Sequence, residues 1–283
     1  MITRFAPSPT GPLHLGHAYS ALLAYGMAIA AGGTFLLRIE DIDRTRARDT
    51  WETQIYDDLG WLGLTWPAPV MRQSERMSAY SIALDALWTK GFLYVCDCSR
   101  RDVQNAMSAP QEGMTQIGPD GLVYPGTCRE KNQPTVRPKD VTLRLRTEAA
   151  VTVRTLSYIE SYATKEHRKI EIKPSDLVKN VGDIVVARKD MGTSYHLSVV
   201  LDDANQEITD VVRGNDLAEA TQIHVLLQSL LDLPTPAYHH HGLIRDETGK
   251  RLAKRDDARA LAKYRAEGAT PNDIRRMVGL PDA

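Results

Sequence analysis

The segment from Arg4 to His17 constrains this chain more than any other, because it joins a strand, a tight turn and a helix start. Residues 2–6 can form a short buried strand, and the cluster of Pro, Ser, Thr and Gly residues that follows forces an irregular turn. An Ala-rich helix is expected from about His14, and a helix amino terminus favours anionic ligands such as phosphate. His14 and His17 share one face of the first turn, and Gly16 leaves room for a base or a ribose to approach the backbone.

Strands and helices alternate along the first third of the chain. We expect strands over residues 2–6, 34–39 and 92–95 and helices over residues 14–31, 48–60 and 74–90. Such alternation predicts a parallel sheet that is covered by helices on both faces. Ligands of these sheets bind at the carboxyl ends of the strands, so Arg4 and Glu40 are expected beside one cleft.

A different pattern occupies residues 96–180, which hold all three cysteines and a polar loop. From about Asp183 the alternation returns, with expected strands over 183–186 and 208–212, helices over 195–201 and 217–231, and a strand after residue 234. We therefore predict an α/β chain in three parts: the first half of a nucleotide-binding domain (1–95), an inserted subdomain (96–180), and the second half with a basic loop and a short helical tail (181–283).

The charge balance excludes a global attraction to nucleic acid. The chain has 283 residues, with 35 basic and 36 acidic side chains, so any RNA contact must use local patches. The amino terminus shows no signal-peptide pattern. The uncharged stretch 18–37 is long enough for a membrane span, but Gly32-Gly33 interrupts it and favours a buried helix followed by a buried strand. We expect a cytoplasmic protein without a membrane partner, and a monomer, because no large apolar stripe requires a second copy.

The three cysteines, Cys96, Cys98 and Cys128, are an odd and sparse set. Such a set argues against a disulfide scaffold and fits a reducing compartment. Three thiolates can hold one structural Zn²⁺ ion, although no histidine or fourth cysteine lies nearby; three free buried thiols are the alternative. The run of histidines at residues 239–241 lies on a strand-like stretch, where neighbouring side chains point to opposite faces, so we expect no chelate there.

A basic loop occupies residues 249–255. A mobile, glycine-flanked loop with several cations can close over a triphosphate and balance charge as pyrophosphate leaves. Taken alone, the same segment also fits a solvated basic turn.

Charged residues at strand ends match the groups of an acidic amino acid. Arg4 and Arg213 can bind a side-chain carboxylate, since a guanidinium pairs with a carboxylate in bidentate fashion. Glu40 can bind the ammonium group, and Tyr195 can add a hydroxyl. Arg213 and Glu40, each taken singly, also fit an ordinary surface ion pair.

Residues 4–17 resemble the HIGH signature of class I aminoacyl-tRNA synthetases, and their flanks resemble the glutamyl branch of that family. The basic loop resembles the KMSKS loop, with two departures: Arg251 stands for the first lysine and Ala253 for the serine. Arg251 keeps the charge, whereas Ala253 loses a hydroxyl. Lys254 matches the second lysine and is the expected main phosphate contact.

The resemblance implies a Rossmann-like parallel sheet with an inserted zinc-containing subdomain, and it assigns residues to three sites. The glutamate site comprises Arg4, Phe5, Ala6, Pro7, Ser8, Glu40, Tyr195 and Arg213. The ATP site comprises His14, Gly16, His17, Arg251 and Lys254, of which His14, His17 and Lys254 are the catalytic residues. The resemblance also supplies a fourth zinc ligand, Tyr124, beside Cys96, Cys98 and Cys128.

Only about 28 residues follow Arg255. This length and the Cys-x-Cys…Tyr-x-x-x-Cys pattern resemble a short subfamily without an anticodon-binding domain. The subfamily activates glutamate with ATP and Mg²⁺ without tRNA and transfers it to the queuosine base of tRNA(Asp). Composition and spacing alone reach only ATP-dependent activation of an acidic amino acid.

Three alternatives remain open from the sequence. The first is a shortened glutamyl enzyme that charges the tRNA 3′ end, the second a non-catalytic RNA-binding relative, and the third a small-molecule nucleotidyltransferase. We expect tRNA contacts among the basic residues Arg137, Lys139, Arg144, Arg146, Arg275 and Arg276.

Overall fold

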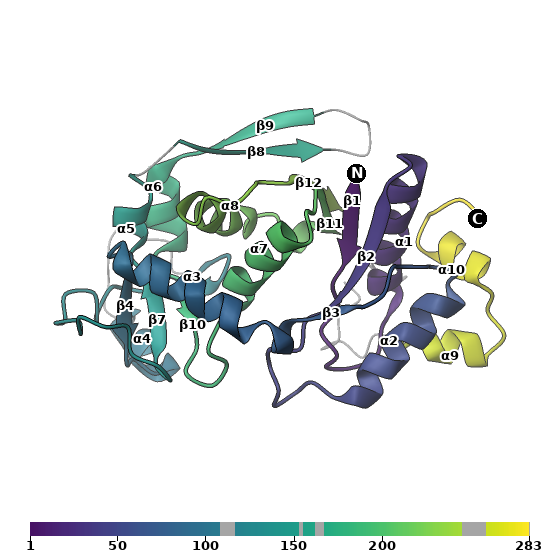
Figure 1. Cartoon of the computed structure of the whole chain (residues 1–283). Helices are drawn as coiled ribbons and strands as arrows, with labels where there is room; N and C mark the ends of the chain where they lie inside the picture. The colour runs from purple at the N-terminus through teal and green to yellow at the C-terminus, as the bar shows by residue number, and fades with distance from the viewer. Residues whose placement is uncertain (108–116, 153–154, 162–166, 245–258, 283) are drawn as a thin grey trace.

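The computed structural model describes residues 1–107, 117–152, 155–161, 167–244 and 259–282 (Figure 1). A parallel sheet forms its centre. β1 (Ile2–Phe5) pairs with β2 (Thr34–Ile39), and β2 pairs with the short β3 (Met71–Arg72). The alternation of strands and helices in the first third therefore predicts the pairing of the first two strands correctly.

The second half of the sheet joins the first along β1. The amide of Thr209 donates to the carbonyl of Ile2 across 3.0 Å, which sets β11 (Asp210–Gly214) beside β1. β11 pairs in parallel with β12 (Ala237–His241). The carboxyl ends of β1, β2, β11 and β12 thus lie along one edge of the sheet, where ligands of parallel sheets bind.

Helices cover both faces of these strands. α1 (Leu15–Ala30) packs against β1, β2 and β11, and Figure 1 shows α7 (Tyr195–Asn205) on the other side of the strands. α8 (Thr221–Leu230) packs against α7. The carboxyl-terminal α9 (Leu261–Ala266) and α10 (Pro271–Met277) lie on the side of α1 and α2 (Asp49–Trp61).

α1 begins and ends at residues that the sequence marks. His14 is the N-cap: its Nδ1 accepts the amide of Gly16, and Nδ1 of His17 accepts the amide of His14. The helix stops before Gly32, whose φ of +61° favours glycine. A Cβ on Gly33 would lie 2.0 Å from the carbonyl oxygen of Met1, so only glycine lets the chain turn back into β2 at this point.

Two expected strands belong to another sheet. β4 (Leu93–Cys96) and β10 (Val185–Ala187) both pair antiparallel with β7 (Thr142–Leu145). The expectation that the strands at 92–95 and 183–186 extend the parallel sheet is therefore wrong. The apolar runs of these segments correctly indicate buried strands. A short apolar run does not indicate, however, whether a strand pairs in parallel or antiparallel.

A hairpin from the middle of the chain extends the main sheet. β8 (Leu156–Ser161) pairs in parallel with β12 at Tyr238, and β9 (His167–Ile172) pairs antiparallel with β8 (Figure 1). The division into three parts stays a prediction, but this pairing ties residues of the expected insert to the second half of the sheet.

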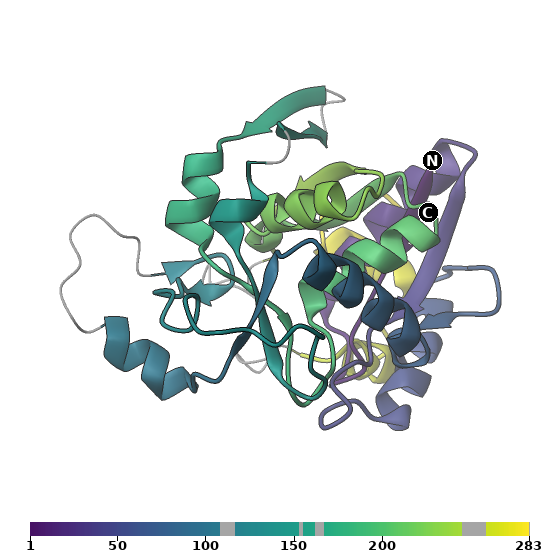
Figure 2. The ribbon, with the colours of Figure 1, turned by 60° about the vertical axis from the view of Figure 1, so that its left-hand side comes forward.

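The remaining described elements range from two to 13 residues in length. They are η1 (Gln73–Glu75), α3 (Met77–Thr89), α4 (Arg100–Met107), β5 (Ile117–Gly118), β6 (Gly121–Leu122), α5 (Thr147–Ala150), α6 (Pro174–Asp176), η2 (Leu177–Val181) and η3 (Asn215–Leu217). Figure 2 shows α4 projecting from the body of the molecule. Within the described ranges, no helix has the length and apolar character needed to cross a membrane.

Candidate active site

A cavity of about 350 Å³ opens at the carboxyl ends of the parallel strands. β1, β2 and β11 contribute Arg4, Glu40 and Arg213 at or just past their ends, and α1 contributes its first turn. The predicted residues that line the cavity are Arg4, Phe5, Ala6, His14, Gly16, His17, Glu40, Tyr195 and Arg213.

The two histidines of the first turn of α1 are held together. Their ring centroids lie 3.8 Å apart with an interplanar angle of 30°. Each ring also accepts a backbone amide through Nδ1, at 3.1 Å for His14 and 3.2 Å for His17. Because Nδ1 accepts in both rings, each Nε2 carries the proton of the neutral imidazole and can donate to a phosphate oxygen.

Arg4 belongs to a buried network of charges. Its Nε and Nη2 donate to the two carboxylate oxygens of Asp203 at 3.0 and 3.2 Å. Arg38 donates to Asp203 at 2.7 Å and to Glu40 at 3.1 Å. Burial by itself would raise the pKa of Asp203, but the charges of Arg4 and Arg38 outweigh it and lower that pKa. Asp203 is therefore ionised and neutralises part of the positive charge at this end of the cavity.

Glu40 lies at the end of β2, where its amide donates to the carbonyl of Pro7. Burial raises the pKa of Glu40, although the charges of Arg38 and Arg4 oppose that shift. Tyr195, at the start of α7, also lines the cavity, and burial raises the pKa of its phenol. The tyrosine therefore keeps its proton and can donate a hydrogen bond to a substrate.

Arg213 follows the buried run of β11 and is 5% exposed. Its Nη1 donates to Nδ1 of His224 at 3.0 Å, and its Nε donates to Nε2 of His240 at 3.1 Å. Its Nη2 donates to Oγ1 of Thr221 and to the carbonyl of Leu217. These four contacts fix the guanidinium at the cavity wall.

Two predicted residues of the glutamate site stay outside the cavity lining. Pro7 is buried and Ser8 is exposed. Arg251 and Lys254 lie outside the described residues. The flanks of their loop are nevertheless placed at the site: Ile244 lines the cavity, and Ala260 forms a β-bridge with His14.

The sequence analysis missed polar residues of the lining. Nε2 of His241 lies 2.7 Å from the hydroxyl of Ser20, and its Nδ1 donates to the carbonyl of Gly242. The register of β11 and β12 sets His241 opposite Gly214, so one histidine of the triple run reaches the cavity. The other missed lining residues are Val212, Gly214, Asp216, Leu217, Leu243 and Ile244.

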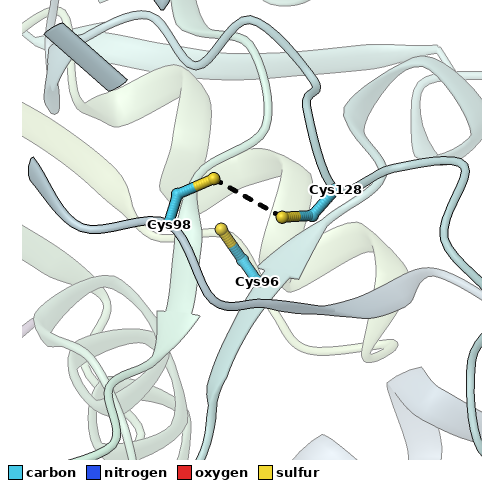
Figure 3. A group of neighbouring side chains, drawn as sticks. All are labelled: Cys96, Cys98 and Cys128. Atoms are coloured by element: carbon cyan, nitrogen blue, oxygen red, sulfur yellow. Dashed lines mark hydrogen bonds between the residues drawn. The ribbon is translucent and has the colours of Figure 1, made fainter. Parts of the chain in front are cut away.

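The three cysteines converge away from this cavity. Their sulfur atoms lie within 4.8 Å of one another and face each other in Figure 3. The hydroxyl of Tyr124 lies 3.4 Å from Sγ of Cys96 and 3.3 Å from Sγ of Cys98, and it accepts the amide of Cys128 at 2.9 Å. Ligands of a tetrahedral zinc ion with bonds of about 2.3 Å lie roughly 3.8 Å apart. The four donors therefore fit one zinc ion.

Five of the six basic residues that we expected to contact tRNA, all except Lys139, make hydrogen bonds or ring contacts within the chain. Arg137 donates to Asp85, Arg144 lies 3.8 Å above the ring of Tyr124, and Arg146 lies 4.9 Å from the ring centre of Tyr94. In the tail, Arg275 donates to the carbonyl of Pro281 and Arg276 to Asp282. These contacts leave a role in RNA binding untested.

Comparison with known proteins shows the family to which this chain belongs. Residues 1–281 match the catalytic domain model of the class I tRNA synthetases (E and Q). The chain is 62% identical to a glutamyl-Q tRNA(Asp) synthetase of Rhodobacter capsulatus, over 99% of this chain and 100% of that protein. It is 39% identical to one of Nocardia farcinica, over 98% of this chain and 85% of that protein.

Solved structures agree on the fold. A glutamate tRNA ligase of Elizabethkingia meningosepticum, in complex with its amino acid, superposes with a TM-score of 0.74 at 25% identity. That match covers 98% of this chain and 60% of the ligase, so the chain spans about three fifths of the larger protein. A methionyl-tRNA synthetase of Mycobacterium tuberculosis superposes with a TM-score of 0.61 at 11% identity, over 98% of this chain and 63% of that one.

Proposed function

The chain belongs to the glutamate and glutamine branch of the class I tRNA synthetases, and on this premise we propose that it activates glutamate with ATP and transfers it to the queuosine base of tRNA(Asp). It is a ligase-type enzyme. The observation that carries the proposal is the 62% identity over the full length of a relative named for this reaction. Arg213 and Glu40 in one cavity support the choice of glutamate.

Activation joins the α-carboxylate of glutamate to the α-phosphate of ATP. A carboxylate oxygen attacks the α-phosphorus in line, a phosphorus–oxygen bond forms, and pyrophosphate leaves with the electron pair of the bond that breaks. Donors that face the phosphates lower the barrier by stabilising the charge that develops there. We assign this role to Nε2 of His14 and of His17. Mg²⁺ would supply Lewis-acid charge neutralisation in this step.

The basic loop completes the phosphate site in this proposal. Residues 245–258 are bounded by Ile244 in the cavity wall and by Ala260 beside His14. In this proposal Lys254 and Arg251 contact the leaving pyrophosphate. Ala253 cannot supply the hydroxyl that the family places at this position.

Transfer is the second step. A hydroxyl of the queuosine base attacks the activated carbonyl, a carbon–oxygen ester bond forms, and the bond from the carbonyl carbon to the phosphate oxygen breaks. AMP leaves with that electron pair, and the hydroxyl proton passes to the solvent. Within the described part of the chain, the residues that line the cavity include no side chain to which we assign the proton of that hydroxyl.

We propose that Cys96, Cys98, Tyr124 and Cys128 hold one structural Zn²⁺ ion. Arg144 supports the site, because its Nε donates to Sγ of Cys96 at 3.3 Å and favours the thiolate. Bound zinc would tie the end of β4 to the segment around Tyr124 by its ligand bonds. Cysteines without a disulfide and a tRNA substrate together favour the cytoplasm as the compartment of this chain, which we propose to act as a monomer.

Isotope exchange between pyrophosphate and ATP tests the activation step. The proposal predicts exchange that needs glutamate and proceeds without tRNA. Exchange supported equally by glutamine would contradict the assigned amino acid, and exchange that needs tRNA would favour a shortened enzyme that charges a tRNA 3′ end.

A further inference from the structure

The two arginines of the cavity differ in how their charge is balanced. Nε and Nη2 of Arg4 both donate to the carboxylate of Asp203. Among the described residues, no carboxylate oxygen lies within 4.0 Å of the Arg213 guanidinium. Its partners are two imidazoles, a hydroxyl and a carbonyl. Of the five N–H groups of a guanidinium, these contacts use four and leave one on Nη1.

The donors of Arg213 fix the tautomers of its two histidines. A guanidinium only donates, so Nδ1 of His224 and Nε2 of His240 must both accept. The single proton of His224 then sits on Nε2 and points at Nδ1 of His196, 3.1 Å away. The single proton of His240 sits on Nδ1 and points at Glu160, 2.8 Å away. Neither ring can gain a proton without breaking its bond to Arg213.

Both chains of hydrogen bonds end on a carboxylate that stands away from Arg213. Nε2 of His196 donates to Asp120, in the turn between β5 and β6, at 3.2 Å. On the other side, Glu160 lies beyond the ring of His240. The carboxylate of Glu160 also accepts the backbone amide of His240. Two imidazole rings thus separate Asp120 from the guanidinium of Arg213, and one ring separates Glu160 from it. The direct contacts of Arg213 therefore include no counterion for its positive charge.

We propose that His224 and His240 are positioning residues that hold Arg213 as uncharged acceptors, and so keep its full positive charge for the side-chain carboxylate of glutamate. This inference rests on the proposed function and deepens it. A carboxylate in place of either imidazole would hold the arginine equally well but would neutralise it. The cavity would then prefer the amide of glutamine to the carboxylate of glutamate.

The surroundings of the two histidines agree with uncharged rings. His224 faces Arg213, Arg4, His196, His240 and the ring of Tyr195, and burial followed by the charge of Arg213 lowers its pKa well below the usual value. Burial also lowers the pKa of His240, with Arg213 acting in the same direction and Glu160 opposing. Thr221, His241 and the ring of Tyr238, whose centroid lies 6.0 Å from that of the His240 ring, are further neighbours of His240.

A matched pair of variants at His224 tests the proposal. Asn places a carbonyl oxygen near the position of Nδ1, and Asp has the same shape but carries a charge. We expect His224→Asn to keep the preference for glutamate. We expect His224→Asp to raise the KM for glutamate by about 10- to 100-fold over His224→Asn, with the KM for ATP unchanged and the ratio of glutamate to glutamine activation reduced.

Pyrophosphate exchange with the full chain separates the outcomes. Equal KM values for glutamate in the Asn and Asp variants, while the wild-type chain activates glutamate, would overturn the inference alone. A wild-type chain that activates no glutamate would overturn the proposed function and this inference with it. If thermal melting shows that the Asp variant does not fold, the longer pair His224→Gln and His224→Glu repeats the comparison of a neutral with a charged acceptor. The same rise in the KM for glutamate, against an unchanged KM for ATP, is then expected for the Glu variant relative to the Gln variant.

Discussion

Arg4 and Asp203 form a buried ion pair, although 199 positions separate them in the chain. Asp203 on α7 thereby holds the carboxyl end of β1 in place, and through Arg38 it also holds Glu40 at the end of β2. One carboxylate thus fixes charged groups on two neighbouring strands. Asp203 is buried and does not line the cavity. The candidate glutamate site therefore depends on a residue outside its lining.

Replacement of Asp203 by Asn should destabilise the fold strongly. Two arginines would lose their shared counterion while remaining buried, and breaking such a pair costs about 3–5 kcal/mol. Chemical denaturation measures the loss. Asp190→Asn is the control, because Asp190 pairs with Arg188 at an exposed site and its loss should change stability by less than about 0.5 kcal/mol.

The same ion pair predicts how stability depends on pH. The pKa of Asp203 is lower in the folded than in the unfolded chain, since the charges of Arg4 and Arg38 outweigh the effect of burial. Its contribution to stability is therefore complete above the ordinary carboxyl pKa of 3.8 and is lost as pH falls through the lower, folded value. Denaturation of the wild-type and Asp203→Asn chains from pH 6 to about pH 3 should narrow the difference between their free energies of unfolding, by up to about 1.4 kcal/mol for each pH unit below 3.8; a constant difference would contradict this account.

Arg213→Ala should raise the KM for glutamate about 10- to 100-fold, because the variant loses a charged hydrogen bond worth about 1.5–3 kcal/mol. The KM for ATP should stay near the wild-type value. Arg213→Lys keeps the charge but cannot reach His224 and His240 with the same fork, so it should recover only part of the affinity. Unchanged glutamate dependence in the Ala variant would remove the assigned amino-acid site.

Glutamate binding should depend on the ionisation of Glu40. Burial raises the pKa of Glu40, with Arg38 and Arg4 opposing, and only the ionised group can pair with the ammonium of the substrate. The KM for glutamate is therefore expected to fall as pH rises through this raised value. Glu40→Gln should bind glutamate weakly and lose that part of the pH profile. A wild-type profile that matches the Gln variant would count against the role of Glu40.

Metal analysis of the purified chain should find about one zinc ion per molecule. Cys128→Ser should lose the metal and lower the Tm by about 5 °C or more, since structural zinc contributes directly to folding. Tyr124→Phe keeps the three thiols but leaves the amide of Cys128 without its partner, so it should bind zinc more weakly than the wild-type chain. A fully folded wild-type chain without metal would leave three free thiols as the correct interpretation.

The sequence predicted the central strands and α1 because their signals are local. The turn before His14 and the Gly32-Gly33 break fix both ends of α1, and the match to the class I tRNA synthetases confirms the family that residues 4–17 indicated. The directions of β4 and β10 were not predictable, since both depend on a partner far along the chain.

The buried polar groups around the site were also missed, for a related reason. Asp203 sits in an amphipathic helix, and nothing near it in the sequence indicates Arg4 as its partner. His224 and His240 read as ordinary members of a helix and of a histidine run. Only the folded chain shows that both rings meet the same guanidinium.

The most direct test of the proposed function uses ATP, labelled glutamate and bulk tRNA from two sources, one containing queuosine and one lacking it. The account predicts label in the queuosine-containing tRNA(Asp) alone. Label in tRNA(Glu) from both sources would contradict it and would identify a shortened enzyme that charges the tRNA 3′ end.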